Sequence, residues 1–325
     1  CVSNLRSRAR RKDAYDCAFS ALLLESSYRY PRWVQGDPLA DAARVARPAG
    51  DGKAVGRPLP AVGLGGGAGG KFGGRRGGRA RLGRGKGKGK DIADAIKTCL
   101  DRLVATQGAD GAWSQDGKQF VEATAWALLA LLGDGSTLRS GPYRESVKSA
   151  SRWLLDRVDD SGRIQEEGAS FDVRVHAIAA SAVAECAMLS SYGPMQERVQ
   201  PMIRALESLR SPRGGWGRTA GDTVDWATTA WAVTALKATL DGGAPVDPAG
   251  LQATRELVRS ASPDVDSSAT VLFSAFWLGL DPKRTPKMIE WAKLLKPGPL
   301  VVGDGSLFAL YGNYQMGGRW WQGWS

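Results

Sequence analysis

The sequence predicts an all-α protein built from tandem helical hairpins. Three observations lead to this fold class. Apolar residues recur at helical spacing from residue 91 onward, glycine-containing turns separate one helix from the next, and the same helix–turn–helix unit returns with a period of about fifty residues. Residues 91–325 are therefore expected to form one repeat domain. An apolar content of 43% is enough to give it a core.

The first hairpin shows the pattern of the unit. One face of its first helix is apolar and comprises Ile92, Ile96, Cys99, Leu100, Leu103 and Val104. The turn at 107–113 ends this helix, and the second helix, at 124–131, is apolar nearly all round. The hairpin is thus expected to pair an amphipathic outer helix with a buried inner helix.

The unit then returns four times. Outer helices are expected at 150–155, 202–206, 251–258 and 286–295, and inner helices at 176–180, 229–236, 268–280 and 306–316. Hairpins with an apolar inner helix cannot bury it alone, so they stack around a common centre. A closed ring would need about six hairpins. With about five, the ring is expected to be open or the domain to be truncated at its C-terminal end.

The turns carry a family resemblance. Gln107-x-x-x-Gly111-x-Trp113 is similar to the QW motif of squalene-hopene cyclases, and the spacing returns at Gly214-x-Trp216, with Arg in place of Gln four residues before Gly214. Thr-Ala-Trp-Ala also occurs twice, once in each of two inner helices. Over about 230 residues the chain resembles the prenyltransferase and squalene-oxidase repeat of the terpenoid cyclase and protein prenyltransferase superfamily. It is most similar to squalene-cyclase-like bacterial proteins of planctomycete type, a group without settled chemistry.

The resemblance implies an α/α toroid in which the Gln and Trp of each motif tie one outer helix to the next. It also implies a catalytic acid, since class II cyclases protonate an alkene or epoxide with the DxDD motif. In Asp264-Val265-Asp266-Ser267, Asp266 matches the proton donor and Asp264 the first flanking acid, while Ser267 replaces the second. Asp264 and Asp266 are equally typical of residues that cap a helix. The same alternative applies to Asp222 and Asp225, which precede another inner helix.

Several side chains on the inner helices are predicted to line a central apolar hollow: Trp126, His176, Trp231, Phe273 and Trp277. The alternative is that they are ordinary core residues. His176 is the only histidine and lies ten residues before Cys186, and the four cysteines (Cys1, Cys17, Cys99 and Cys186) are far apart. We therefore expect no metal site, no disulfide framework and no cofactor.

The N-terminal part of the chain differs in composition. Residues 1–50 are expected to be partly helical, with no assigned function. Residues 52–90 hold eleven Lys or Arg and no acid, which accounts for the net charge of +11, and glycine is frequent there. Residues 51–90 are therefore expected to be a disordered linker. An RNA-binding role for 71–90 is a second interpretation, although Phe72 is its one aromatic residue.

No run of about twenty apolar residues is present, so a membrane span is not expected. A cytoplasmic location and, if Cys1 is the lipidated residue of a processed lipoprotein, the cell envelope both stay open. The leading hypothesis for function is a noncatalytic repeat module that binds an apolar, polyprenyl-like ligand or a protein partner. The alternatives are a class II triterpene-cyclase-like isomerase or lyase that uses Asp266, and an RNA-associated protein.

Overall fold

A computed structural model describes residues 88–115, 118–296, 304–316 and 320. Cys1, Cys17, the segment 1–50 and most of the basic segment 51–90 lie outside the described residues. The first described helix begins at Lys88, three residues earlier than the predicted start of the repeat domain. An antiparallel ribbon of two short strands, β1 (Ser114–Gln115) and β2 (Lys118–Gln119), joins the first two helices.

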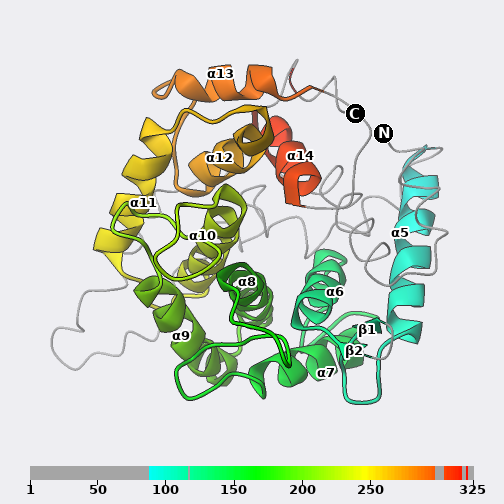
Figure 1. Ribbon diagram of the computed structural model, residues 1–325. Coiled ribbons are helices and arrows are strands. Elements are labelled where there is room, and N and C mark those ends of the chain that lie inside the picture. Colours follow the sequence, from blue (N-terminus) through cyan, green and yellow to red (C-terminus); the bar gives the residue numbers. More distant parts are fainter. Residues whose placement is uncertain (1–87, 116–117, 297–303, 317–319, 321–325) are drawn as a thin grey trace, which may run out of the picture.

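The described residues form ten helices that alternate between two layers (Figure 1). The outer helices are α5 (Lys88–Ala105), α7 (Arg144–Leu155), α9 (Gly193–Ser208), α11 (Pro248–Ser260) and α13 (Lys287–Leu294). The inner helices are α6 (Val121–Gly133), α8 (Val173–Ser190), α10 (Trp226–Asp241), α12 (Val265–Trp277) and α14 (Asp304–Met316). Consecutive inner helices pack side by side from α6 to α14. The fold is an α/α toroid, which confirms the prediction, and the described part contains five hairpins.

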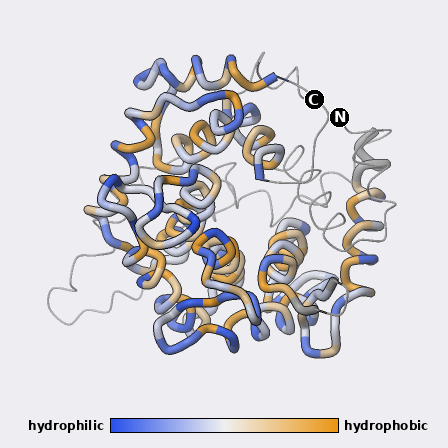
Figure 2. The backbone as a smooth tube through the Cα atoms, in the orientation of Figure 1, coloured by the Kyte–Doolittle hydropathy of each residue, from blue (hydrophilic) through white to orange (hydrophobic). Residues whose placement is uncertain are grey.

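The two layers differ in how much of each helix is buried. Outer helices such as α7 and α11 bury one stripe, whereas every residue of α8 except Arg174 is buried. Figure 2 shows apolar residues gathered on the inner helices and alternating with polar ones on the outer helices. By length and hydropathy α8 would also qualify as a membrane span, unlike the sequence-based expectation, but 94% of that stretch is buried inside the protein. Its apolar surface is covered by its neighbours in the ring.

Three hairpin turns place a glycine where other residues would be strained. Gly111, Gly162 and Gly214 have φ of +100°, +80° and +96°. A Cβ atom at any of them would lie 2.6 Å or less from the backbone of the next outer helix, which is α7, α9 and α11 in turn. Glycine therefore meets two requirements at each turn, a left-handed backbone and a close approach between hairpins.

The tryptophans of the first and third turns make the same two hydrogen bonds. The indole Nε1 of Trp113 and that of Trp216 donate to carbonyls of the outer helix in their own hairpin, at 2.8 and 2.7 Å. The backbone N–H groups of these tryptophans donate to the hydroxyls of Thr124 and Thr229 on the inner helices, at 3.1 Å in both cases. Each turn thus fastens its outer helix to its inner helix.

The residue four positions before each glycine connects neighbouring hairpins. Gln107 donates from Nε2 to the carbonyl of Ser146 on α7, at 3.1 Å. Arg210, which replaces Gln in the third unit, donates to the carboxylate of Asp247, the N-cap residue of α11, at 3.2 Å. Its guanidinium also lies over the ring of Trp216, 4.9 Å from the centroid. Arg and Gln use different chemistry here to make the same link to the next outer helix.

Candidate functional site

Six aromatic rings from four inner helices meet in the interior of the ring. We define this inner aromatic cluster as Trp126 of α6, Trp231 of α10, Phe273 and Trp277 of α12, and Phe308 and Tyr311 of α14. Successive ring centroids lie 5.2 Å apart for Trp126 and Trp231, 5.3 Å for Trp231 and Phe308, and 4.5 Å for Phe308 and Phe273. Phe273 also contacts Trp277 and Tyr311. All six side chains are buried.

The cluster brings together four of the five residues that the sequence placed in the hollow. Phe308 and Tyr311 were not among them. Their spacing of three residues puts them on one face of an apolar helix, and this signal was available in the sequence. In the structure the rings contact one another, and the contacts Trp126–Trp231, Trp231–Phe308 and Phe308–Phe273 each join two different helices.

An ion cluster borders the aromatic rings at the N-terminal ends of the inner helices. We define the Arg174 ion cluster as Arg174 of α8, Glu122 of α6 and Asp304 of α14. The guanidinium lies 3.0 Å from a Glu122 carboxylate oxygen and 2.7 Å from one of Asp304. The same carboxylates accept the indole N–H groups of Trp126, at 3.4 Å, and Trp231, at 3.1 Å. Sequence reasoning missed this cluster entirely.

Neighbouring carboxylates favour the charged form of the Arg174 guanidinium. Burial of the guanidinium opposes its charge, but the carboxylates of Asp304 and Glu122 outweigh this and raise the pKa of Arg174. The side chains of Arg174, Glu122 and Asp304 are only 15%, 26% and 10% exposed. Both carboxylates accept hydrogen bonds from a guanidinium and an indole.

A further carboxylate caps the N-terminal end of α6. Glu166, from the connection between α7 and α8, accepts the backbone N–H groups of Val121, at 2.7 Å, and Glu122, at 2.9 Å. Burial raises the pKa of Glu166, against the opposing effect of these two hydrogen bonds. The N-cap residue of α6, Phe120, has no side-chain cap of its own. Glu166 therefore takes the place of a local cap and connects the second hairpin to the first.

His176 lies apart from the inner aromatic cluster. Its Nδ1 accepts the backbone N–H of Ile164 at 3.3 Å, and its Nε2 lies 3.1 Å from the carbonyl oxygen of Met202 on α9. The side chain is fully buried, and burial lowers its pKa to about 4. A neutral imidazole with Nε2 protonated satisfies both contacts. His176 thus accepts the turn's N–H as Thr124 and Thr229 do in the hairpins on either side.

The two acids of the DxDD-like sequence lie at the exposed N-terminal end of α12. Asp264 is the N-cap residue and accepts the backbone N–H and the hydroxyl of Ser267, which lower the pKa of its carboxyl. Asp266 is exposed in the first turn. Phe273 follows seven residues later, roughly 10 Å further along the helix axis. Asp225 caps α10 in the same way as Asp264 caps α12, and Asp222 is exposed.

The remaining ionisable candidates are buried or dispersed. Cys99 and Cys186 are buried in the core, and burial raises the pKa of the Cys186 thiol to about 12. Such a thiol is unreactive at neutral pH. Within the described ranges, no group of three His, Cys, Asp or Glu residues is arranged to hold a metal ion.

The fold and the contacts between hairpins define the chain as an α/α-toroid protein. Solved structures similar to it include a type II terpene cyclase from Scytonema bound to geranylgeranyl dihydroxybenzoate, at 15% identity and TM-score 0.46, which covers 94% of this chain and 80% of that one. A protein from Actinoplanes matches at 17% identity and TM-score 0.45, over 65% of this chain and 66% of that one. A rhamnosidase from Klebsiella oxytoca with bound rhamnose matches at 17% identity and TM-score 0.42, over 62% of this chain and 45% of its own. No protein-family model and no curated protein matches the sequence.

Proposed function

We propose that this chain is a noncatalytic α/α-toroid module that holds an apolar, isoprenoid-like ligand against the inner aromatic cluster. The observation that carries the proposal is the contact chain of six buried rings contributed by four different helices. Ligand sites are commonly apolar and aromatic with a few fixed polar groups, and here the Arg174 ion cluster supplies such groups at one end.

The packing of the cluster is compatible with ligand entry. The six rings come from four helices, and the aromatic contacts between these helices are made by side chains. A chain-like apolar molecule would exchange ring–ring contacts for ring–ligand contacts, and no backbone hydrogen bond of a helix would break. Aromatic faces suit the alkenes of an isoprenoid because both surfaces are apolar and polarisable.

The positions of the acids argue against proton-initiated catalysis. Protonation of an alkene requires a protonated carboxylic acid aimed into the apolar space. Asp266 and Asp264 are exposed at the end of α12, and Asp264 is engaged as a helix cap. The carboxylates that do border the rings, Glu122 and Asp304, are bound to Arg174. The geometry therefore favours binding over turnover.

A binding experiment with a matched pair of tryptophan variants tests the ligand site. Trp231 and Trp153 are both buried and both donate an indole N–H to an aspartate, but Trp231 belongs to the cluster and Trp153 lies on the outer helix α7. We expect Trp231→Phe to weaken co-elution of radiolabelled geranylgeraniol with the protein on gel filtration by about three- to tenfold. Trp153→Phe should leave it unchanged. No retained label, or equal effects of the two changes, would contradict the proposed site.

A second assay tests the absence of turnover. The full chain is incubated with squalene, and products are analysed by mass spectrometry. We expect unchanged squalene. Cyclised products that disappear with Asp266→Asn would establish the class II cyclase alternative and overturn the noncatalytic assignment.

A further inference from the structure

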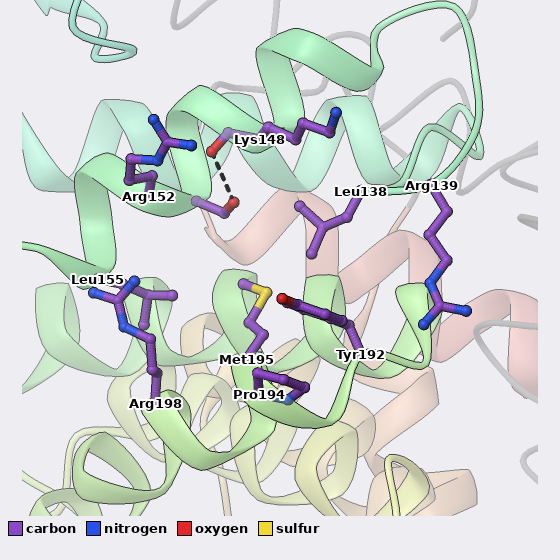
Figure 3. A pocket seen from close by; sticks show the side chains of 10 residues that line it. Leu138, Arg139, Lys148, Arg152, Leu155, Tyr192, Pro194, Met195 and Arg198 are labelled. Atoms are coloured by element: carbon purple, nitrogen blue, oxygen red, sulfur yellow. Dashed lines mark hydrogen bonds between the residues drawn. The ribbon is translucent and has the colours of Figure 1, made fainter.

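We propose that a groove on the outer wall of the toroid binds a single-chain amphiphile with an anionic headgroup. The groove has a volume of about 460 Å³ and lies between α7 and the start of α9, with the α6–α7 connection at one end (Figure 3). This volume falls within the range of small-molecule sites. The groove is separate from the inner aromatic cluster, so the proposal does not depend on the function proposed above.

The floor of the groove is apolar. It is formed by Leu138, Leu155, Tyr192, Pro194 and Met195. Tyr192 is one of only three large hydrophobic side chains that are exposed in the described part of the chain, at 43%. An apolar tail laid along this floor would cover surface that now faces water.

The rim of the groove is basic. Its charged residues are Arg139, Lys148, Arg152 and Arg198, and no acidic residue is among those that line it. Lys148 pairs with Glu145, and Arg198 pairs with an aspartate of the α7–α8 connection.

Two of the rim charges have no acidic partner within the described part of the chain. Arg139 donates to the carbonyl of Ser191, a neutral partner, at 3.1 Å. The side chain of Arg152 makes no hydrogen bond or ion pair with any described residue, and it is exposed. Figure 3 shows Arg152 and Arg139 on opposite sides of the apolar floor. An anionic headgroup at either end would therefore neutralise a charge that no described acidic residue pairs.

The walls of the groove are held in place by hydrogen bonds between two connections. The hydroxyl of Ser190, at the end of α8, accepts the backbone N–H of Leu138 at 3.1 Å. Ser191, which accepts from Arg139, has φ of +48° and is the one non-glycine residue with positive φ among those described. This left-handed residue ends α8 and puts Tyr192 directly at the N-cap of α9. Strained backbone of this kind is often kept where it positions a binding surface.

The combination of floor and rim selects the class of ligand. A free phosphate would use the cations and leave the apolar floor exposed, whereas a neutral lipid would use the floor and leave the unpaired cations. A molecule that joins an alkyl or acyl chain to a phosphate or carboxylate uses both. Its headgroup would be bound by arginine and its tail by the α7–α9 floor.

Isothermal titration calorimetry of the full chain with three probes tests this class of ligand. Dodecyl phosphate, used below its critical micelle concentration, should bind at least tenfold more tightly than dodecanol or inorganic phosphate. Its affinity should fall as sodium chloride is raised, because the headgroup contacts are exposed and screened. Equal binding of dodecanol would show a purely apolar groove, and equal binding of inorganic phosphate would show a simple anion site. Either result would overturn the proposal.

Variants then assign the binding to the groove. Arg152→Gln should weaken dodecyl phosphate binding about three- to tenfold, and Tyr192→Ser should do the same through the tail. Arg204→Gln is the matched control, because Arg204 is also an exposed arginine of this wall, on α9, but does not line the groove. Unchanged melting temperatures of all three variants would show that they fold. Binding that survives both groove changes, or that Arg204→Gln weakens equally, would contradict the assignment.

Discussion

The interior of the ring and the groove between α7 and α9 differ in how their charged residues are paired. In the interior, Arg174 is paired with two carboxylates, and each carboxylate also accepts an indole N–H. At the groove between α7 and α9, Arg139 and Arg152 have no acidic partner among the residues that the structure describes. The difference indicates that the partly buried charges of the Arg174 ion cluster join separate helices, while the exposed charges of the groove are those that the proposed ligand would pair. The predictions below test the interior first, where removing a partner has the largest consequence.

The largest expected effect comes from removing the central cation. Arg174→Met would leave Glu122 and Asp304 as neighbouring, partly buried carboxylates without a counter-ion, and we expect a loss of up to about 3–5 kcal/mol in the free energy of unfolding. Urea denaturation monitored by circular dichroism measures this. Adding Glu122→Gln and Asp304→Asn to the same chain should recover most of the loss, because no unpaired charge then remains. A loss below about 1 kcal/mol for Arg174→Met alone would mean that the cluster is solvated and not structural.

The same cluster marks the limit of what could be predicted from the sequence. Helical periodicity and the fifty-residue repeat identified ten helices and their inner or outer position, because these depend on patterns within each helix. The ion pairs of Arg174 join residues 52 and 130 positions apart, which no local pattern encodes. The sequence did contain a signal, since Glu122 and Arg174 are charged residues in the first turn of inner helices that are mostly apolar. That these two residues lie close together follows only from the arrangement of the helices in the ring.

The second effect concerns pH and the single histidine. The folded-state pKa of His176 is about 4, below the value of about 6.5 expected in the unfolded chain. As the pH falls from about 6.5 to 4, the unfolded chain binds this proton first, so the folded state loses about 3 kcal/mol of stability; above pH 6.5 the contribution is constant. The difference in unfolding free energy between wild type and His176→Gln, measured from pH 7.5 to 4, should follow this course. The titration of Asp and Glu residues changes the unfolding free energy of both proteins equally, so it cancels in this difference. A difference that does not vary with pH would mean that His176 is accessible to protons in the folded protein.

The third prediction distinguishes the stability cost of backbone strain from the cost of close packing at a turn. Gly214 and Gly221 both have positive φ, +96° and +88°, but a Cβ at Gly214 would meet the backbone of α11 at 2.6 Å, while at Gly221 nothing lies within 4 Å. Gly214→Ala should cost about 2–3 kcal/mol, and Gly221→Ala about 1 kcal/mol. Chemical denaturation of both variants gives the comparison. Equal losses would show that the hairpins can separate at the turn without penalty, contrary to the rigid contact between units.

The smallest effect concerns the two acids at the exposed end of α12, where sequence similarity and local chemistry give different expectations. If the helix-cap interpretation is right, Asp264→Ala should lower the melting temperature by about 2–4 °C, because the N–H of Ser267 loses its acceptor. Asp266→Ala should lower it less, since Asp266 contributes only its charge near the N-terminus of the helix. The cyclase interpretation expects a different order, because a proton donor is kept for its reactivity and not for stability. If the Asp266→Ala protein is more stable than wild type, this would fit an acid that is kept for its function although it lowers the stability of the protein. The relative order of the two melting temperatures therefore distinguishes a capping pair from a relict or working catalytic motif, and it does so without knowledge of the ligand.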